Sequence, residues 1–172
     1  LMDWPLEPDQ LEDALTHQEE YGVEVWEAPD YGFFFIAFHC NRTPTNYTAF
    51  RQAIAYLTDT EYIDTEILRG TGEILCSVVS PAYPAVYSSP TYWVGTGNPS
   101  GIEYPVACWY ENFPFNITKA YETLIDAGFT YDDVNEEWIA PDGTHFSDLP
   151  LYARSDDPRR LAVGMMYANI IE

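Results

Sequence analysis

His39 and Cys40 are adjacent residues whose types could supply a base and a nucleophile for covalent catalysis. A cysteine attacks as its thiolate, and an imidazole within hydrogen-bond reach can accept the thiol proton. The two residues end an apolar run that predicts a β-strand, and neighbours on a strand point to opposite faces of the sheet. We therefore predict a buried thiol beside a half-exposed histidine, and no nucleophile–base pair.

Asp133, Asn135 and Glu137 alternate along the chain like the first ligands of a calcium-binding loop. Such a loop needs a glycine at its sharp turn and a bidentate glutamate at its end. Trp138 occupies the glycine position, and no glutamate follows at the required distance. We interpret the stretch as a solvated hairpin and predict no metal and no other cofactor.

Other catalytic patterns are missing from the sequence. His17 and His145 lie in no motif, and there is no G-x-S-x-G, H-E-x-x-H or phosphate-binding loop. The glycines at 95 and 97 lead into Asn98-Pro99, not into a helix, so they do not predict a phosphate site. With 28 acidic residues, any choice of an acid–base pair would be arbitrary. The sequence therefore predicts a protein that is not an enzyme.

The composition describes an acidic protein that can bury a core. The chain of 172 residues carries 28 acidic and 7 basic residues, with a formal net charge of -21, and 47% of it is hydrophobic. Residues 1–172 predict a single domain. Phosphate backbones and anionic membranes would repel such a chain, so we predict no nucleic-acid partner. No apolar run is long enough to span a membrane.

The first third of the chain predicts a helix followed by two strands. Residues 8–21 have the amphipathic spacing of a helix, and Gly22 follows them. VEVWEA (23–28) alternates like a half-buried strand, and GFFFIAFHC (32–40) is continuously apolar, as in a strand covered on both faces. This order of elements predicts a wound α/β fold.

FRQAIAYLTDTEYI (50–63) contains two helix signals in succession. Its apolar residues recur at helical spacing up to Leu57, and Thr58 with Glu61 forms a capping-box pattern. We therefore predict that one helix ends near Leu57 and that another begins near Thr58.

Residues 70–114 form a long excursion rich in proline and tyrosine. The prolines exclude a long helix, and the aromatic residues exclude a flexible linker. Cys76 and Cys108 bracket the excursion and could form a disulfide, or both could be free, buried thiols. Its aromatic side chains could line a binding surface or pack as local core; they are Tyr83, Tyr87, Tyr92, Trp93 and Trp109.

The last third predicts a helix, a hairpin, a strand and a final helix. Asn116 or Thr118 can cap a helix that ends at Gly128. The Pro-Asp-Gly at 141–143 predicts a hairpin turn, and residues 149–153 predict a strand. Ser155 precedes an acidic first turn and predicts the cap of a helix that runs to the end of the chain.

Three stretches together resemble one protein family. GFFFIAFHCNRTPTNYTAFRQAIAYLTDTEYI (32–63) joins an apolar strand, an Asn, a proline loop and an Arg-Gln-Ala-Ile helix. ITKAYETLIDAGF (117–129) and EEWIAPDGTHFSDLPLYARSDDPRRLAVGMMYANII (136–171) follow in order. This arrangement resembles the peptide- and nickel-binding family, family 5, of ABC-transporter extracytoplasmic solute-binding proteins. The resemblance implies one lobe of a type II periplasmic-binding-protein-like fold, a mixed sheet flanked by helices.

The resemblance also implies a function and a location. It implies a partial C-terminal lobe of a two-lobed receptor, extracellular or periplasmic and anchored through a segment that precedes this sequence. Such a receptor captures an oligopeptide or similar solute and delivers it to ABC permease subunits; the alternative is a cell-surface sensory or interaction module without transport. The counterpart of Tyr31, Phe33 and Phe34 borders the ligand cleft in the family. The alternative for the two phenylalanines is a place in the sheet core.

Overall fold

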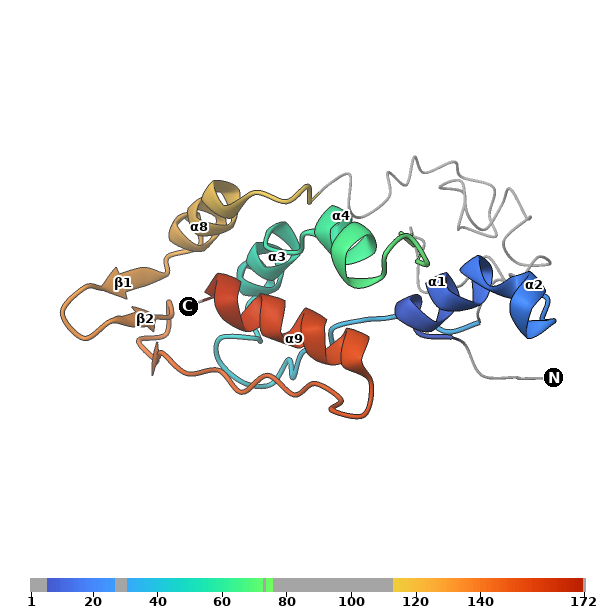
Figure 1. The fold of residues 1–172 in the computed structure, drawn as a ribbon. Coiled ribbons are helices and arrows are strands. Elements are labelled where there is room, and N and C mark those ends of the chain that lie inside the picture. Colours follow the sequence, from blue (N-terminus) through green and yellow to red (C-terminus); the bar gives the residue numbers. More distant parts are fainter. Residues whose placement is uncertain (1–5, 27–30, 73, 76–112, 172) are drawn as a thin grey trace, which may run out of the picture.

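The computed structural model describes residues 6–26, 31–72, 74–75 and 113–171, and the structural statements below refer to these ranges. Helices make up most of the regular structure, with one small antiparallel sheet. In chain order the elements are α1 (Pro8–Thr16), α2 (Gln18–Tyr21), α3 (Thr48–Tyr56), α4 (Thr60–Tyr62), the π-helix η1 (Ile63–Ile67), α8 (Ile117–Asp126), β1 (Thr130–Asp132), β2 (Glu137–Ile139), β3 (His145–Phe146) and α9 (Pro158–Ile171). Figure 1 shows α3 and α9 between the sheet at one end and α1 and α2 at the other.

The core lies where α3, the sheet and α9 meet. Its buried side chains are Phe50, Ile54, Phe129, Ala140, Met166 and Tyr167. Phe129, only 1% exposed, packs edge-on against Tyr47 and Phe146, with ring centroids 5.3 and 6.2 Å apart. Edge-to-face packing of this kind adds to the stabilisation from burial of the aromatic surface. The two halves of the described chain therefore share one core.

The helix pair confirms the predicted order but corrects one cap. α3 ends at Tyr56 with Leu57 as its C-cap, close to the predicted end, and Phe50 and Ile54 on its predicted apolar face are buried. Asp59, not Thr58, caps α4, because its carboxylate accepts a hydrogen bond from the backbone N–H of Tyr62 at 2.9 Å. The prediction for Thr58 is wrong since its hydroxyl donates instead to the carbonyl of Ile54 at 2.9 Å.

α8 and the sheet follow the local signals of the sequence. The side chain of Asn116 caps α8 by accepting a hydrogen bond from the N–H of Lys119 at 2.8 Å, which decides the choice between Asn116 and Thr118. β1, β2 and β3 form an antiparallel meander. Gly143 closes the predicted turn between β2 and β3 at φ 83°, a conformation that favours glycine. The hairpin prediction is confirmed.

Three predicted strands are wrong. Residues 32–39, 23–26 and 149–153 lie in neither strand nor helix in the described part of the chain. A strand needs a second backbone to pair with its N–H and C=O groups, and apolar patterning cannot supply that partner. Among the described residues the sheet is confined to positions 130–146, so the expected mixed sheet is not seen there. Residues 76–112 of the predicted Pro/Tyr-rich excursion (70–114) lie outside the described residues; they include Cys76, Cys108, Tyr83, Tyr87, Tyr92, Trp93 and Trp109.

α9 begins at Pro158, and Asp157 satisfies its first N–H groups. The Asp157 carboxylate accepts hydrogen bonds from the N–H groups of Arg159 and Arg160 at 3.1 and 3.2 Å. The prediction of Ser155 as cap is therefore wrong by two residues, because the nearer carboxylate occupies the cap position. Within α9, a Cβ added to Gly164 would lie 2.8 Å from the Cβ of Ala153, so glycine permits close approach of the preceding segment.

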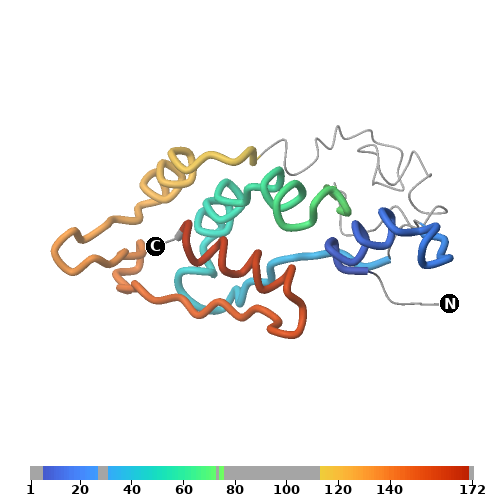
Figure 2. Tube along the Cα trace, viewed as in Figure 1, coloured from blue at the N-terminus to red at the C-terminus, as the bar shows by residue number. Residues whose placement is uncertain are grey.

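α1 and α2 fulfil the prediction of an N-terminal helix that ends at Gly22. The helix is interrupted at His17, and neither half contributes a buried residue. Ion pairs connect α1 to the rest of the molecule: Arg69 contacts Asp9, and Arg159 Nε lies 3.4 Å from Glu7 Oε2. Figure 2 shows the segment that precedes α3 running toward it from the side of α1. Polar contacts therefore place α1 beside the start of α9.

Candidate functional site

The residues predicted to border a ligand lie together on an exposed stretch, residues 31–36, which we call the aromatic segment. Tyr31, Phe33 and Phe34 are all exposed, and Phe35 is 72% exposed. The rings of Phe33 and Phe35 lie 5.5 Å apart. In the described structure these phenylalanines are therefore not part of a sheet core. Adjoining exposed apolar side chains occur at interaction surfaces, so the aromatic segment is a candidate for ligand contact.

Phe34 is the member of the aromatic segment that contacts α9. The guanidinium carbons of Arg160 and Arg159 lie 4.9 and 6.0 Å from the centroid of its ring. Both distances fall within the range of a cation–π interaction. The ring nevertheless remains 42% exposed. The first turn of α9 thus supports one side of Phe34 and leaves part of the ring accessible.

Each of the three arginines near the start of α9 has a carboxylate partner. Arg160 Nε lies 3.1 Å from Asp157 Oδ2, and Arg159 Nε lies 3.4 Å from Glu7 Oε2. Arg154 contacts Asp156 at 2.6 Å, and this hydrogen bond lowers the pKa of Asp156 to about 2. Paired in this way, the arginines do not form an open anion site.

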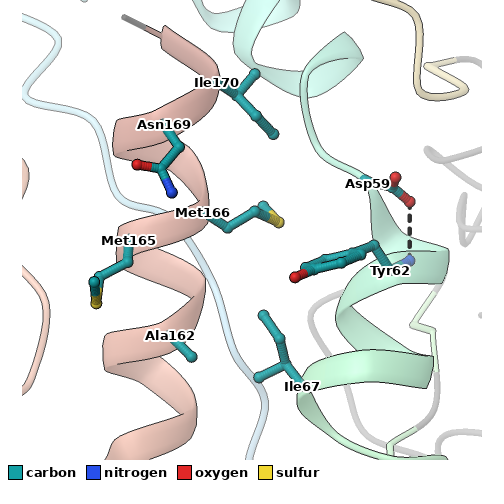
Figure 3. Close-up of a pocket in the computed structure, with 8 residues that line it drawn as sticks. All are labelled: Asp59, Tyr62, Ile67, Ala162, Met165, Met166, Asn169 and Ile170. Atoms are coloured by element: carbon teal, nitrogen blue, oxygen red, sulfur yellow. Dashed lines mark hydrogen bonds between the residues drawn. The ribbon is translucent and has the colours of Figure 1, made fainter.

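A groove of about 440 Å³ separates α4 and η1 from α9 (Figure 3). Tyr62 and Met166 point toward each other across it, and Met165 lies on its outer side. The groove is lined by Asp59, Tyr62, Ile67, Ala162, Met165, Met166, Asn169 and Ile170. The Asp59 carboxylate accepts the hydrogen bond that caps α4, so it does not form an acid–base pair in the groove. The rest of the lining mainly provides apolar contact. A second groove of about 400 Å³ lies between α1 and residues 69–71.

The predicted polar pairs make no catalytic arrangement in the described structure. His39 and Cys40 are both exposed, which corrects the prediction of a buried thiol; the strand that would have buried it is not formed. The Cys40 Sγ donates to the carbonyl of Phe38 at 3.5 Å. In the hairpin, Glu137 contacts His145 Nδ1 at 2.7 Å. Within the described ranges, no three His, Cys, Asp or Glu side chains gather as metal ligands.

Asp132, not Asp133, organises the loop that resembled a calcium site. Its carboxylate accepts hydrogen bonds from the backbone N–H of Val134 at 2.9 Å and the side-chain amide of Asn135 at 2.8 Å. These hydrogen bonds lower the pKa of Asp132, with the Asn135 side chain the largest cause. The carboxylate therefore stabilises a turn, as the hairpin interpretation requires.

Arg159 and Arg160 are the site residues that sequence reasoning missed. Acidic side chains are preferred in the first turn of a helix, where cations meet the positive end of its dipole. Two adjacent arginines at that position, in a chain with only 7 basic residues, are a departure from this preference. That departure was the available signal that something other than helix stability places them there.

Comparison with known proteins identifies the family. The family model described as bacterial extracellular solute-binding proteins, family 5, middle, matches residues 3–168. No curated protein and no solved structure matches the chain. Among the described residues, no helix has both the length and the apolarity to cross a membrane. Proteins of this family bind solutes outside the cell for ABC transport, and they are generally not enzymes. The chain belongs to family 5 of the bacterial extracellular solute-binding proteins.

Proposed function

We propose that this chain forms part of a receptor that captures an oligopeptide or a similar solute and delivers it to an ABC permease. Family membership supports a solute-binding role in such transport in general. The observation that favours a peptide is the aromatic segment, in which apolar rings are exposed on a stretch without helix or strand. No ligand is needed to open this surface, because it is already accessible.

The physical case for a peptide rests on how extended chains are recognised. A backbone outside helices can hydrogen-bond along a peptide main chain, and neighbouring side-chain pockets then hold alternate residues of the ligand. Phe33 and Phe34 would supply such apolar contacts on neighbouring positions, and Tyr31 would add a hydroxyl at the edge. In the complete receptor we propose that this sequence is part of one lobe, and that closure of a second lobe over the ligand excludes water.

The test uses the full-length protein and calorimetric titration with a panel of short peptides. Phe34→Ala should weaken the best peptide about tenfold, equivalent to about 1.4 kcal/mol, because an aromatic contact is lost. The matched control is Tyr152→Ala, which removes an aromatic side chain that is 91% exposed and distant in sequence. Equal affinities of the wild-type and Phe34→Ala proteins for every peptide would show that the aromatic segment does not bind the ligand.

Transport is tested separately in cells. Deletion of the gene should abolish uptake of a labelled form of the peptide that binds most tightly, and the wild-type gene should restore it. Uptake that continues at the normal rate without the gene would contradict a role in import, even if the purified protein binds peptides.

A further inference from the structure

We infer that Arg159 and Arg160 hold the ring of Phe34 and make this position favour apolar over cationic ligand side chains. The inference rests on the proposed function, because it requires Phe34 to contact the ligand. It names a property of the solute, the absence of positive charge at one position, that family membership does not specify.

The first step is the geometry at the ring. Arg160 places its guanidinium carbon 4.9 Å from the centroid of Phe34, and Arg159 places its own at 6.0 Å. The electron-rich face of an aromatic ring attracts one cation at such distances. Here that attraction is already used by groups of the protein itself. Because the ring is still 42% exposed, a ligand side chain can reach the remainder of it.

The second step is that each guanidinium group is paired with a carboxylate. Asp157 contacts Arg160 Nε at 3.1 Å and also accepts hydrogen bonds from the backbone at the start of α9. Glu7, which precedes α1, lies 3.4 Å from Arg159 Nε. Arg159 and Asp157 have only 22% and 15% of their side chains exposed, so solvent screens their charges less than it screens fully exposed pairs, whereas the Arg160 side chain is 39% exposed. The two arginines are therefore positioning residues for the ring.

The third step compares the charges around Phe34 with the net charge of the whole chain. A net charge of -21 produces a long-range field that draws cations toward the molecule. At Phe34 a ligand ammonium or guanidinium group would instead meet a ring whose cation–π interaction is occupied and carboxylates that are already paired with Arg159 and Arg160. An apolar side chain meets neither obstacle. The local arrangement thus opposes the overall charge, and the ligand that fits it is a peptide with an apolar residue at this position.

The experiment measures a ratio of affinities in the full-length protein. Pairs of peptides that differ only by Leu or Lys, placed at each position in turn, are titrated into wild type and variants. For the wild type we expect Leu to be favoured about tenfold at one position. Arg160→Gln should reduce that ratio to about threefold or less by removing the nearer charge. The matched control Arg154→Gln removes one arginine from the same region without a ring contact and should leave the ratio unchanged.

Further variants distinguish a failure of the inference from a failure of folding or of the proposed ligand surface. If Arg160→Gln does not fold, Arg160→Met keeps the packing of the stem, removes the charge and must reduce the ratio in the same way. Arg160→Lys keeps the charge and should retain most of the preference. A ratio that is unchanged in the neutral Arg160 variants, or absent in wild type, overturns the inference. If Phe34→Leu leaves all peptide affinities unchanged, the proposed ligand surface itself is wrong. If Phe34→Leu weakens peptide binding but the Leu/Lys affinity ratio is the same in Arg160→Gln as in wild type, only the inference fails.

Discussion

The hydroxyl groups of Thr58 and Tyr167 lie 2.7 Å apart and form a hydrogen bond between residues 109 positions apart in the chain. The same Thr58 hydroxyl lies 2.9 Å from the carbonyl of Ile54, at the end of α3. Tyr167 is buried in the core beside Met166. This contact joins the end of α3 to α9 and satisfies a polar group that would otherwise be buried without a partner.

Tyr167→Phe should lower the free energy of unfolding by about 1 kcal/mol, the usual net value of such a hydrogen bond. The ring stays buried, so the apolar contribution is kept. Urea denaturation of both proteins measures the difference, and Tyr121→Phe, at an exposed position, is the control. Equal stability of Tyr167→Phe and wild type would mean that the hydroxyl pair contributes nothing.

Stability should decline at alkaline pH because of Tyr167. Burial raises the pKa of this tyrosine above its ordinary value of 10.0, so the folded state favours the protonated form. Its contribution is complete below pH 10.0 and is lost as the pH rises through the folded pKa. Denaturation midpoints above pH 10 should therefore fall less steeply in Tyr167→Phe than in wild type. Parallel pH profiles would contradict this assignment.

Stability should also decline at acid pH, because of Asp156. Its hydrogen bond with Arg154 lowers the pKa from 3.8 to about 2, so the folded state favours the carboxylate. The contribution is present above pH 3.8 and is lost as the pH falls toward 2. Asp156→Asn should flatten the acid limb of the stability profile, whereas Glu20→Gln, which removes an exposed charge, should not. A steeper acid limb in Asp156→Asn would rule out the predicted linkage.

Phe129→Ala should be among the most damaging substitutions in the described core. The side chain is 1% exposed and packs against two other rings, and truncation of a buried phenylalanine typically costs about 3–5 kcal/mol. Phe35→Ala removes the same atoms from a position that is 72% exposed and should change stability by less than about 0.5 kcal/mol. Thermal unfolding measures the loss of stability in each variant, and similar losses in the two would contradict the buried placement of Phe129.

Gly164→Ala tests the contact between α9 and the segment before it. Alanine at a helix interior gains about 1 kcal/mol over glycine from propensity, but the new Cβ would meet the Cβ of Ala153 at 2.8 Å. Overpacking of a close contact costs about 1–3 kcal/mol, so a net loss of stability is expected. The second change Ala153→Gly should restore stability by removing the opposing atom. Stabilisation by Gly164→Ala alone would show that the contact relaxes freely.

Local signals predicted helices and turns well because the interactions that form them lie within a few residues. Leu57 marks the end of α3 and Gly143 closes the hairpin, as predicted, and Asn116, one of the two predicted candidates, caps α8. At Thr58 and Ser155 the prediction erred by one or two residues because a neighbouring aspartate supplied the cap.

The predictions of three strands were wrong because apolar patterning does not show whether a second strand lies beside the segment. Residues 32–39 have the composition of a buried strand, yet no strand lies beside them in the described structure. The exposure of Phe33 and Phe34, which makes them candidates for ligand contact, follows from that missing partner. The contact of Phe34 with Arg160, more than 120 positions away, depends on the tertiary fold. The resemblance to the family indicated Tyr31, Phe33 and Phe34, and only the fold gave their surroundings.

The shared core has a consequence for biosynthesis. Phe50 in α3 is covered in part by residues of the sheet and by α9, which emerge from the ribosome more than 75 residues later. Until then the nascent chain lacks the residues that cover this part of the core. We therefore expect this core to form only after α9 has been synthesised.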